Sequence, residues 1–281
     1  MDTIILRKYH GLGNDYLILD PKKNEIKLQD RYIELMCRRK YGIGSDGILY
    51  GPIIENGEIH VKIFNADGSE AEQGGNAVSI FARYLKDEKY VTDEAVDIYT
   101  KAGKVHVRYL DEKGDTLCVN MGKAAFFSIG NTIEMPDTDM KTEPLQFNGN
   151  MYNTVCLSIG TPNCVIMTEN VSEGCAEELG PYVENADYFP TRINMELMKV
   201  VSRDTLEIEN YARGEGYVPS SGTGACAAAA AAYKMGLTDS KVTVKMPGGD
   251  MQIEIADNKD VFMTGHVVPV GEVTLAENFF A

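Results

Sequence analysis

The sequence of 281 residues has no tryptophan, only four histidines and few basic residues. Its 27 lysines and arginines face 42 aspartates and glutamates, which gives a formal net charge of −15 at pH 7. This charge argues against nucleic acid or an anionic membrane surface as a partner. It does not exclude a small anionic ligand, because a local group of backbone amides can outweigh a distant field.

Long apolar runs and paired-cysteine motifs are also missing. No hydrophobic stretch approaches the length that crosses a bilayer, and the first residues, Met1-Asp2-Thr3, do not resemble a signal peptide. The six cysteines show neither a CxxC pair nor a disulfide-framework spacing. We therefore expect a cytoplasmic protein whose thiols are reduced and mostly buried. The length suits two domains of ordinary size, each with its own core.

The most informative segment is a glycine-rich turn that leads into an alanine run. Alanine has the highest helix propensity, so residues 225–235 are predicted to be helical, with the helix starting at Thr223 or Gly224. A helix with almost no polar side chain belongs in a core. The first amides of such a helix have no partner within it, and the helix dipole places partial positive charge there. Gly222, Thr223 and Gly224 would leave these amides open to a carboxylate. A buried helix behind a tight turn is the plainer interpretation.

A second copy of this pattern favours a carboxylate-binding turn over a merely tight one. Gly74-Gly75-Asn76 precedes another mostly apolar stretch, residues 77–85. Four matches keep the same order along the chain, with an offset that shrinks from 149 to 142 residues: Asn14 with Asn163, Gly75 with Gly222, Gly103 with Gly248, and Met121 with Met263. We interpret this as a tandem duplication. The predicted halves are residues 1–120 with 266–281, and residues 121–265, and the Asp-, Pro- and Gly-rich stretch 135–150 is the expected linker or crossover.

Several motifs, taken together, resemble the diaminopimelate epimerases over nearly the whole chain: His10–Asp15, Phe64–Glu70, Gly75-Asn76, Asn194, Arg213-Gly214, Ser221–Cys226 and Pro247–Gly249. The resemblance implies an α+β fold of two pseudo-symmetric domains, each a curved mixed or antiparallel β-sheet wrapped around a central helix. It also implies a ligand cleft between the domains and no pyridoxal phosphate, metal or other cofactor. The expected partner is a small amino acid or dicarboxylate; a homodimer stays open.

The resemblance also implies one catalytic cysteine in each half, one removing the α-proton and the other returning a proton. Those two positions correspond to Gly74 and Ser221 in this chain. Glycine can transfer no proton, and a serine hydroxyl is a much weaker acid than a thiol. Further departures lie in the same motifs: Gly47 replaces a glutamine, Thr161-Pro162-Asn163 replaces Asn-Pro-His, and Ala212 replaces a glutamate. We therefore expect two-thiol epimerisation to be lost or altered.

The residues that would bind the ligand are kept. The resemblance assigns one carboxylate to Gly75, Asn76, Gly222 and Thr223, and the remaining substrate contacts to Asn14, Asn65, Asn194 and Arg213. A guanidinium suits a second carboxylate because it can bind bidentately. The ordinary alternatives are turn capping for the asparagines and a solvated surface charge for the arginine.

Three functions remain open from the sequence. The first is an isomerase or lyase with a replacement acid or base, for which the candidates near the motifs are Ser221, Glu215, Tyr217, Glu72 and Asp46. The second is a catalytically silent binding paralogue. The third is a cysteine-substituted form of a working epimerase, which the additional changes at Gly47, Thr161, Asn163 and Ala212 disfavour.

Overall fold

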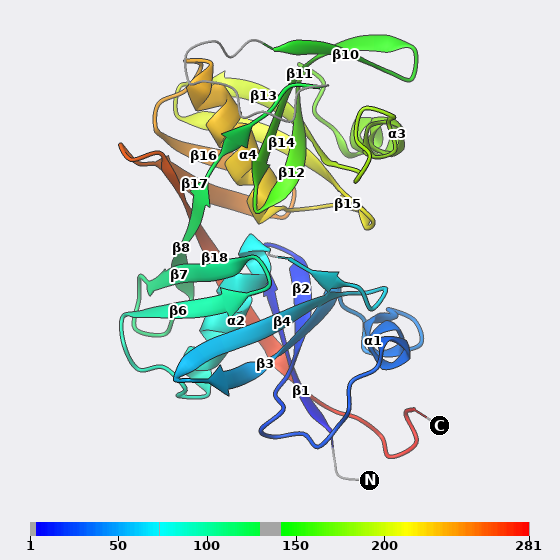
Figure 1. Ribbon diagram of the computed structural model, residues 1–281, viewed down its shortest axis with the longest axis vertical. Coiled ribbons are helices and arrows are strands. Elements are labelled where there is room, and N and C mark those ends of the chain that lie inside the picture. The colour runs from blue at the N-terminus through cyan, green and yellow to red at the C-terminus, as the bar shows by residue number, and fades with distance from the viewer. Residues whose placement is uncertain (1–3, 73, 130–141, 281) are drawn as a thin grey trace. The chain divides into compact units, whose positions relative to one another are not determined.

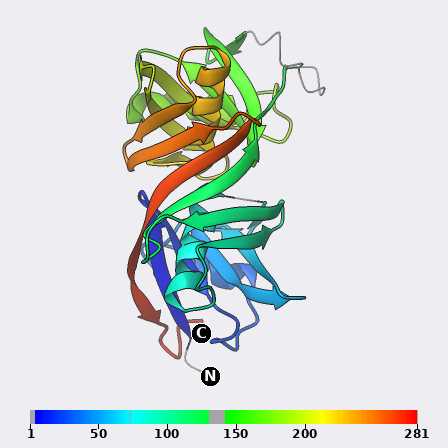
Figure 2. The ribbon, with the colours of Figure 1, turned by 90° about the vertical axis from the view of Figure 1, so that its left-hand side faces the viewer.

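The computed structural model describes residues 4–72, 74–129 and 142–280 (Figure 1). The chain forms two compact units, Met1–Val119 with Gly265–Ala281, and Asn120–Thr264. Both boundaries fall inside strands, namely β8 (Thr116–Lys123) and the long strand β18 (Asp260–Thr274). Figure 2 shows β18 as a continuous ribbon. Two chain segments therefore link the units.

The first unit surrounds one helix with strands. Its elements are, in chain order, β1 (Ile5–Gly11), β2 (Asn14–Leu19), α1 (Asp30–Cys37), β3 (Gly47–Glu55), β4 (Glu58–Asn65), β5 (Glu70–Ala71), α2 (Gly75–Asp87), β6 (Ala95–Thr100), β7 (Gly103–Tyr109) and β8. β1 and β2 are antiparallel, β2 and β3 are parallel across α1, and β3 and β4 are antiparallel. β4 and β6 are parallel across α2, and β6, β7 and β8 form an antiparallel run.

The second unit repeats this plan. It contains β11 (Asn150–Ile159), β12 (Thr161–Met167), α3 (Glu173–Glu184), β13 (Asn194–Ser202), β14 (Thr205–Ala212), β15 (Gly216–Val218), α4 (Gly222–Lys234), β16 (Lys241–Met246), β17 (Gly249–Ile255) and β18. The pairings β11–β12, β12–β13, β13–β14, β14–β16, β16–β17 and β17–β18 have the same directions as their counterparts. The predicted repeat and its α+β architecture are confirmed.

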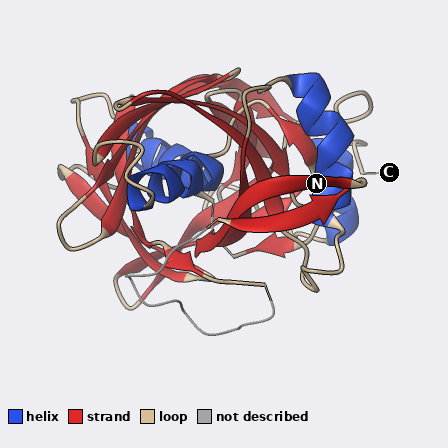
Figure 3. Ribbon diagram, turned by 90° about the horizontal axis from the view of Figure 1, so that it is seen from above, coloured by secondary structure: helices blue, strands red, loops and turns tan. Residues whose placement is uncertain are grey.

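The equivalent helices α2 and α4 form the two cores. Every residue of Gly75–Leu85 and of Gly222–Ala232 is buried. Figure 3 shows helix ribbon enclosed by strands. α2 begins at Gly75, before the apolar run 77–85 that predicted it, and α4 begins at Gly222, just before the expected start at Thr223 or Gly224. Glycine is accepted in the first turn, where amides need no intrahelical partner.

The expectation of a linker over residues 135–150 is wrong for its last part. Residues 135–141 lie outside the described residues, but Glu143–Phe147 forms β10, which pairs with β11 in antiparallel register. Leu145 and Phe147 are both buried in the second unit. Their spacing of two is the strand period, and this short alternation outweighs the turn-forming composition around it. Another short strand, β9 (Ala125–Phe126), pairs with the opposite part of β11.

Within the described ranges, no helix has the length and apolar character that spanning a membrane requires. All six cysteines are free thiols; five are buried and Cys175 is partly exposed.

Candidate functional site

The N-terminus of α2 is capped by a residue without a side chain. Gly74 has an extended backbone, with φ −153° and ψ 127°, and no side chain caps the helix there. Asn76 is buried in the first turn. A Cβ placed on Gly11, at the end of β1, would lie 3.5 Å from Asn76 Oδ1. Because Gly11 pairs with Asn14 across the hairpin, the β1–β2 turn lies beside the start of α2.

The N-terminus of α4 has a real cap. The Oγ of Ser221 accepts a hydrogen bond of 3.0 Å from the backbone N–H of Gly224 and lies 3.3 Å from Thr223 Oγ1. A serine at this position typically stabilises a helix by about 1 kcal/mol. Ser221 therefore has a structural task in addition to any role in proton transfer.

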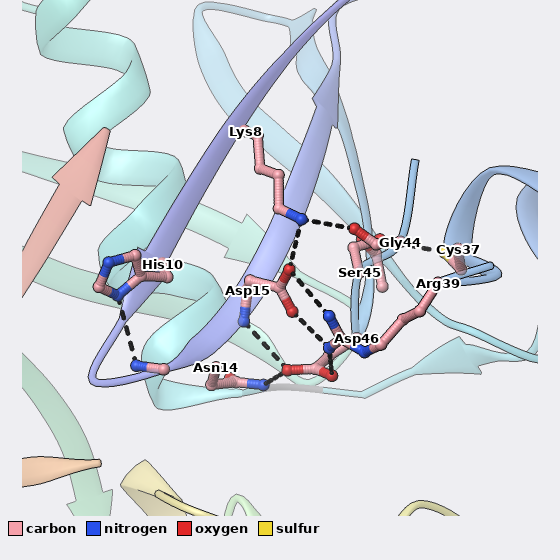
Figure 4. A network of polar contacts seen from close by, with 11 residues as sticks. Lys8, His10, Asn14, Asp15, Cys37, Arg39, Gly44, Ser45 and Asp46 are labelled. Atoms are coloured by element: carbon pink, nitrogen blue, oxygen red, sulfur yellow. Dashed lines mark hydrogen bonds and ion pairs between the residues drawn. The ribbon is translucent and has the colours of Figure 1, made fainter. Parts of the chain in front are cut away.

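Asn14 belongs to a charged network in the first unit (Figure 4). Its Nδ2 donates to Asp46 Oδ2 over 2.8 Å, and the same oxygen accepts the Asp15 N–H over 3.0 Å. Arg39 donates to Asp46 Oδ1 and to Asp15 Oδ1, both over 2.7 Å. A carboxylate only accepts hydrogen bonds, so Asp46 orients the Asn14 amide with its NH₂ group toward the carboxylate. The candidate acid or base Asp46 is thus engaged in positioning its neighbours.

The same network keeps Asp15 ionised. Lys8 lies 2.7 Å from Asp15 Oδ2 and also donates to the Gly44 carbonyl over 2.6 Å. Burial alone would raise the pKa of Asp15, but the hydrogen bonds from Arg39 and Lys8 outweigh it and lower that pKa below its ordinary value.

In the second unit, Asn194 joins two strands and a turn. Its Oδ1 accepts the Arg213 N–H over 2.8 Å, while its Nδ2 donates to Thr161 Oγ1 over 2.9 Å and to Asn163 Oδ1 over 3.2 Å. Both amide hydrogens are thereby used within the protein. The Arg213 guanidinium donates to the Thr191 carbonyl over 3.0 Å, which fixes one of its nitrogens. Asn194 is therefore placed to hold the Arg213 segment in position.

Asn65 makes the contacts of a turn cap. Its Nδ2 donates to Ser69 Oγ over 3.0 Å, and Ser69 Oγ donates to Asp67 Oδ1 over 2.6 Å. The Asn65 N–H also bonds to the Ser69 carbonyl, closing the turn between β4 and β5. This geometry matches the turn-capping alternative for Asn65.

The remaining acid and base candidates differ in their surroundings. Tyr217 donates its hydroxyl to Glu209 Oε2 over 2.9 Å. Burial and then that hydrogen bond raise the pKa of Tyr217, and burial raises the pKa of Glu209. Glu72 and Glu215 are both exposed, and Glu215 closes a turn through its N–H to the Ala212 carbonyl.

The sequence of this chain matches the family described as "Diaminopimelate epimerase" over residues 6–127 and 155–270. The chain belongs to the diaminopimelate epimerase family. It is 40% identical over 275 residues to diaminopimelate epimerase 2 of Nostoc sp., covering 98% of this chain and 96% of that protein. It is 34% identical over 275 residues to the diaminopimelate epimerase of Acetivibrio thermocellus, covering 96% and 98%.

Solved structures agree on the fold. A hydroxyproline epimerase from Agrobacterium vitis has a TM-score of 0.71 at 13% identity, covering 100% of this chain and 93% of that one. A phenazine biosynthesis protein of Bacillus anthracis has a TM-score of 0.69 at 16% identity, covering 98% and 100%. The predicted diaminopimelate-epimerase-like fold is confirmed.

Gly47 and Gly74 are two positions at which this chain was expected to depart from the family pattern. They differ in whether the structure requires a glycine there. A Cβ on Gly47 would lie 2.3 Å from the Phe64 carbonyl oxygen and 2.7 Å from Tyr16 Cε1, so no side chain fits. A Cβ on Gly74 would meet only Ala77 Cβ, at 3.4 Å, which is ordinary contact. Packing therefore explains Gly47, whereas neither packing nor backbone conformation requires glycine at position 74.

Three of the buried thiols are poor nucleophiles. Burial raises the pKa of Cys37 to about 11 and raises that of Cys226 further. A hydrogen bond with Cys156, together with burial, raises the pKa of Cys164. Catalytic thiols need the opposite shift. Within the described part of the chain, no group of three His, Cys, Asp or Glu side chains could hold a metal ion.

Two buried polar residues beside α4, Glu196 and Asn210, were not identified from the sequence. Each is only 1% exposed. The available signal was a charged residue inside the apolar stretch Met195–Met198, but its burial depends on the face that β13 presents to α4.

Proposed function

We propose that this chain is an isomerase-family protein that binds a small amino acid or dicarboxylate without pyridoxal phosphate, and that it lacks the two-thiol epimerisation of its family. Its curated relatives carry the name diaminopimelate epimerase, so diaminopimelate is the first ligand to test. The observation that carries the proposal is the start of α2. Gly74 has no proton to give, although its backbone and surroundings would accept a side chain.

The ligand-binding part of the proposal rests on the two glycine-rich helix starts. Each provides first-turn amides at the positive end of a buried helix, which suits a carboxylate. Arg213 would bind a second carboxylate. Diaminopimelate has two carboxylates and fits this charge requirement.

The test restores the missing thiols. LL-diaminopimelate is incubated in heavy water with the wild-type chain, with Gly74→Cys, with Ser221→Cys and with the double variant. We expect no appreciable LL-to-meso conversion by the wild type and a gain only in the double variant. Each proton-transfer group typically contributes about 10²–10⁴ in rate. Because Gly74 tolerates a Cβ, Gly74→Cys should fold normally and serves as the matched single-thiol control.

The wild-type result separates the alternatives. Solvent deuterium at the α-carbon without inversion would indicate a one-base isomerase. Thermal stabilisation by the ligand without any exchange would indicate a silent binding paralogue. Rapid interconversion of LL- and meso-diaminopimelate by the wild type would refute the proposed loss of epimerisation and show that another residue replaces Gly74.

A further inference from the structure

A pair of polar side chains lies directly beneath the first turn of α4. Glu196 on β13 and Asn210 on β14 are register partners, so they lie side by side on the same face of the sheet. A Cβ placed on Gly224 would lie 2.5 Å from Asn210 Oδ1 and 2.9 Å from Glu196 Oε1. The pair therefore fills the space that any other residue at position 224 would need.

The pair is buried without satisfying its hydrogen bonds. Among the described residues, Glu196 Oε2 and both amide atoms of Asn210 have no hydrogen-bond partner. Unsatisfied buried groups are uncommon in folded proteins, and each one calls for an explanation. An apolar pair would pack beneath α4 without the cost of unsatisfied hydrogen bonds. We therefore look for a functional explanation of the polar pair.

The surroundings of Glu196 favour its neutral form. The thiols of Cys156 on β11 and Cys164 on β12 are the titratable groups that interact with it, and Gly222–Ala232 of α4 adds only the Cys226 thiol. None of these groups is a cation. Burial, and then Cys156, raise the pKa of Glu196 well above its ordinary value.

A charge at this position would compete with a ligand. The N-terminal end of α4 carries partial positive charge, which can favour one carboxylate from outside or an ionised Glu196 from beneath. Two negative charges at one helix end repel each other, and low dielectric strengthens the repulsion. A neutral Glu196 leaves the amides of the first turn to the ligand.

We propose that Glu196 is a positioning residue for the anion-binding turn of α4: neutral, it supports the turn together with Asn210, and ionised, it opposes the ligand carboxylate. This inference rests on the proposed function, which places a carboxylate at that turn. By thermodynamic reciprocity, ligand binding then strengthens proton binding at Glu196.

The test measures binding of pimelate, a dicarboxylate without a titrating amine, by calorimetry from about pH 6 to about pH 9.5. We expect wild-type affinity to fall by up to about tenfold per pH unit once Glu196 ionises, with proton uptake that shows as a binding enthalpy dependent on the ionisation enthalpy of the buffer. Glu196→Gln should keep the affinity of the wild type at low pH and lose this pH dependence. Asn210→Val is the matched control: it changes the same pair without changing a titrating group, so its curve should run parallel to the wild type.

Three results would overturn the inference. Parallel curves for the wild type and Glu196→Gln, with binding intact, would make Glu196 a structural residue only and leave the proposed function standing. Should Glu196→Gln fail to fold, wild-type binding without proton uptake at any pH would overturn the inference equally. Absence of pimelate binding at every pH would overturn the proposed function together with it.

Discussion

Replacing Gly224 by alanine tests the position of the Glu196–Asn210 pair against α4. The new methyl group would lie 2.5 Å from Asn210 Oδ1, well inside contact distance, and both neighbours are buried. Overpacking of a core costs up to about 3 kcal/mol, while alanine gains about 1 kcal/mol over glycine in a helix. We expect Gly224→Ala to lose about 2 kcal/mol of unfolding free energy. The assay is urea denaturation followed by far-UV circular dichroism, since the chain has no tryptophan.

The matched control is Gly174→Ala in α3. A Cβ there meets no atom within 4 Å, so this change should stabilise the protein by about 0.5–1 kcal/mol. Combining Gly224→Ala with Asn210→Ala removes the clashing amide, and the two changes should couple favourably by about 1 kcal/mol. If Gly224→Ala proved as stable as Gly174→Ala, the contact between the buried pair and α4 would be refuted, and the further inference with it.

Two other predictions address the binding frame and the charged network. Arg213→Ala should weaken binding of diaminopimelate by about 1.5–3 kcal/mol, the usual contribution of hydrogen bonds to charged groups; unchanged calorimetric affinity would assign Arg213 to the solvated surface. Asp15→Asn should cost about 1.5–3 kcal/mol at neutral pH, since Arg39 and Lys8 lose a buried anion. The pKa of Asp15 is lower in the folded state than in the unfolded state. The stability that ionised Asp15 contributes is therefore fully present above its unfolded-state pKa, and it is lost as the pH falls through its folded-state pKa. The stability gap to the wild type should narrow in acid, and a gap that stayed constant with pH would contradict this assignment.

The core helices and the repeat could be predicted because their signals are local. The alanine run needs no partner to indicate a buried helix, and a glycine turn before an apolar stretch recurs at a nearly constant offset. The strand β10 escaped prediction because only two inward residues, Leu145 and Phe147, carry its signal within a turn-forming composition.

The contacts of the site depended on information that no single segment carries. Ser221 could be aligned with a catalytic position, but its hydrogen bond to the Gly224 N–H appears only once the helix start is fixed. Likewise, the contact of Glu196 and Asn210 with Gly224 requires the register of β13 with β14 and the placement of α4 over that face. A glycine that is required by distant side chains cannot be distinguished from one in a flexible turn by sequence alone.

The two repeats differ most where their helices begin. In the first unit, Gly74 leaves the start of α2 without a side-chain cap, and the neighbouring charged network holds the Asn14 amide in one orientation. In the second unit, Ser221 occupies the Gly224 amide, so that Gly222 and Thr223 supply the first-turn amides still open to an anion. In its neutral form, the buried Glu196 beneath that turn would add no competing charge. On the proposed function, the two turns of this duplicated scaffold would differ in electrostatics, and a carboxylate bound at the α4 turn would sense the protonation of Glu196.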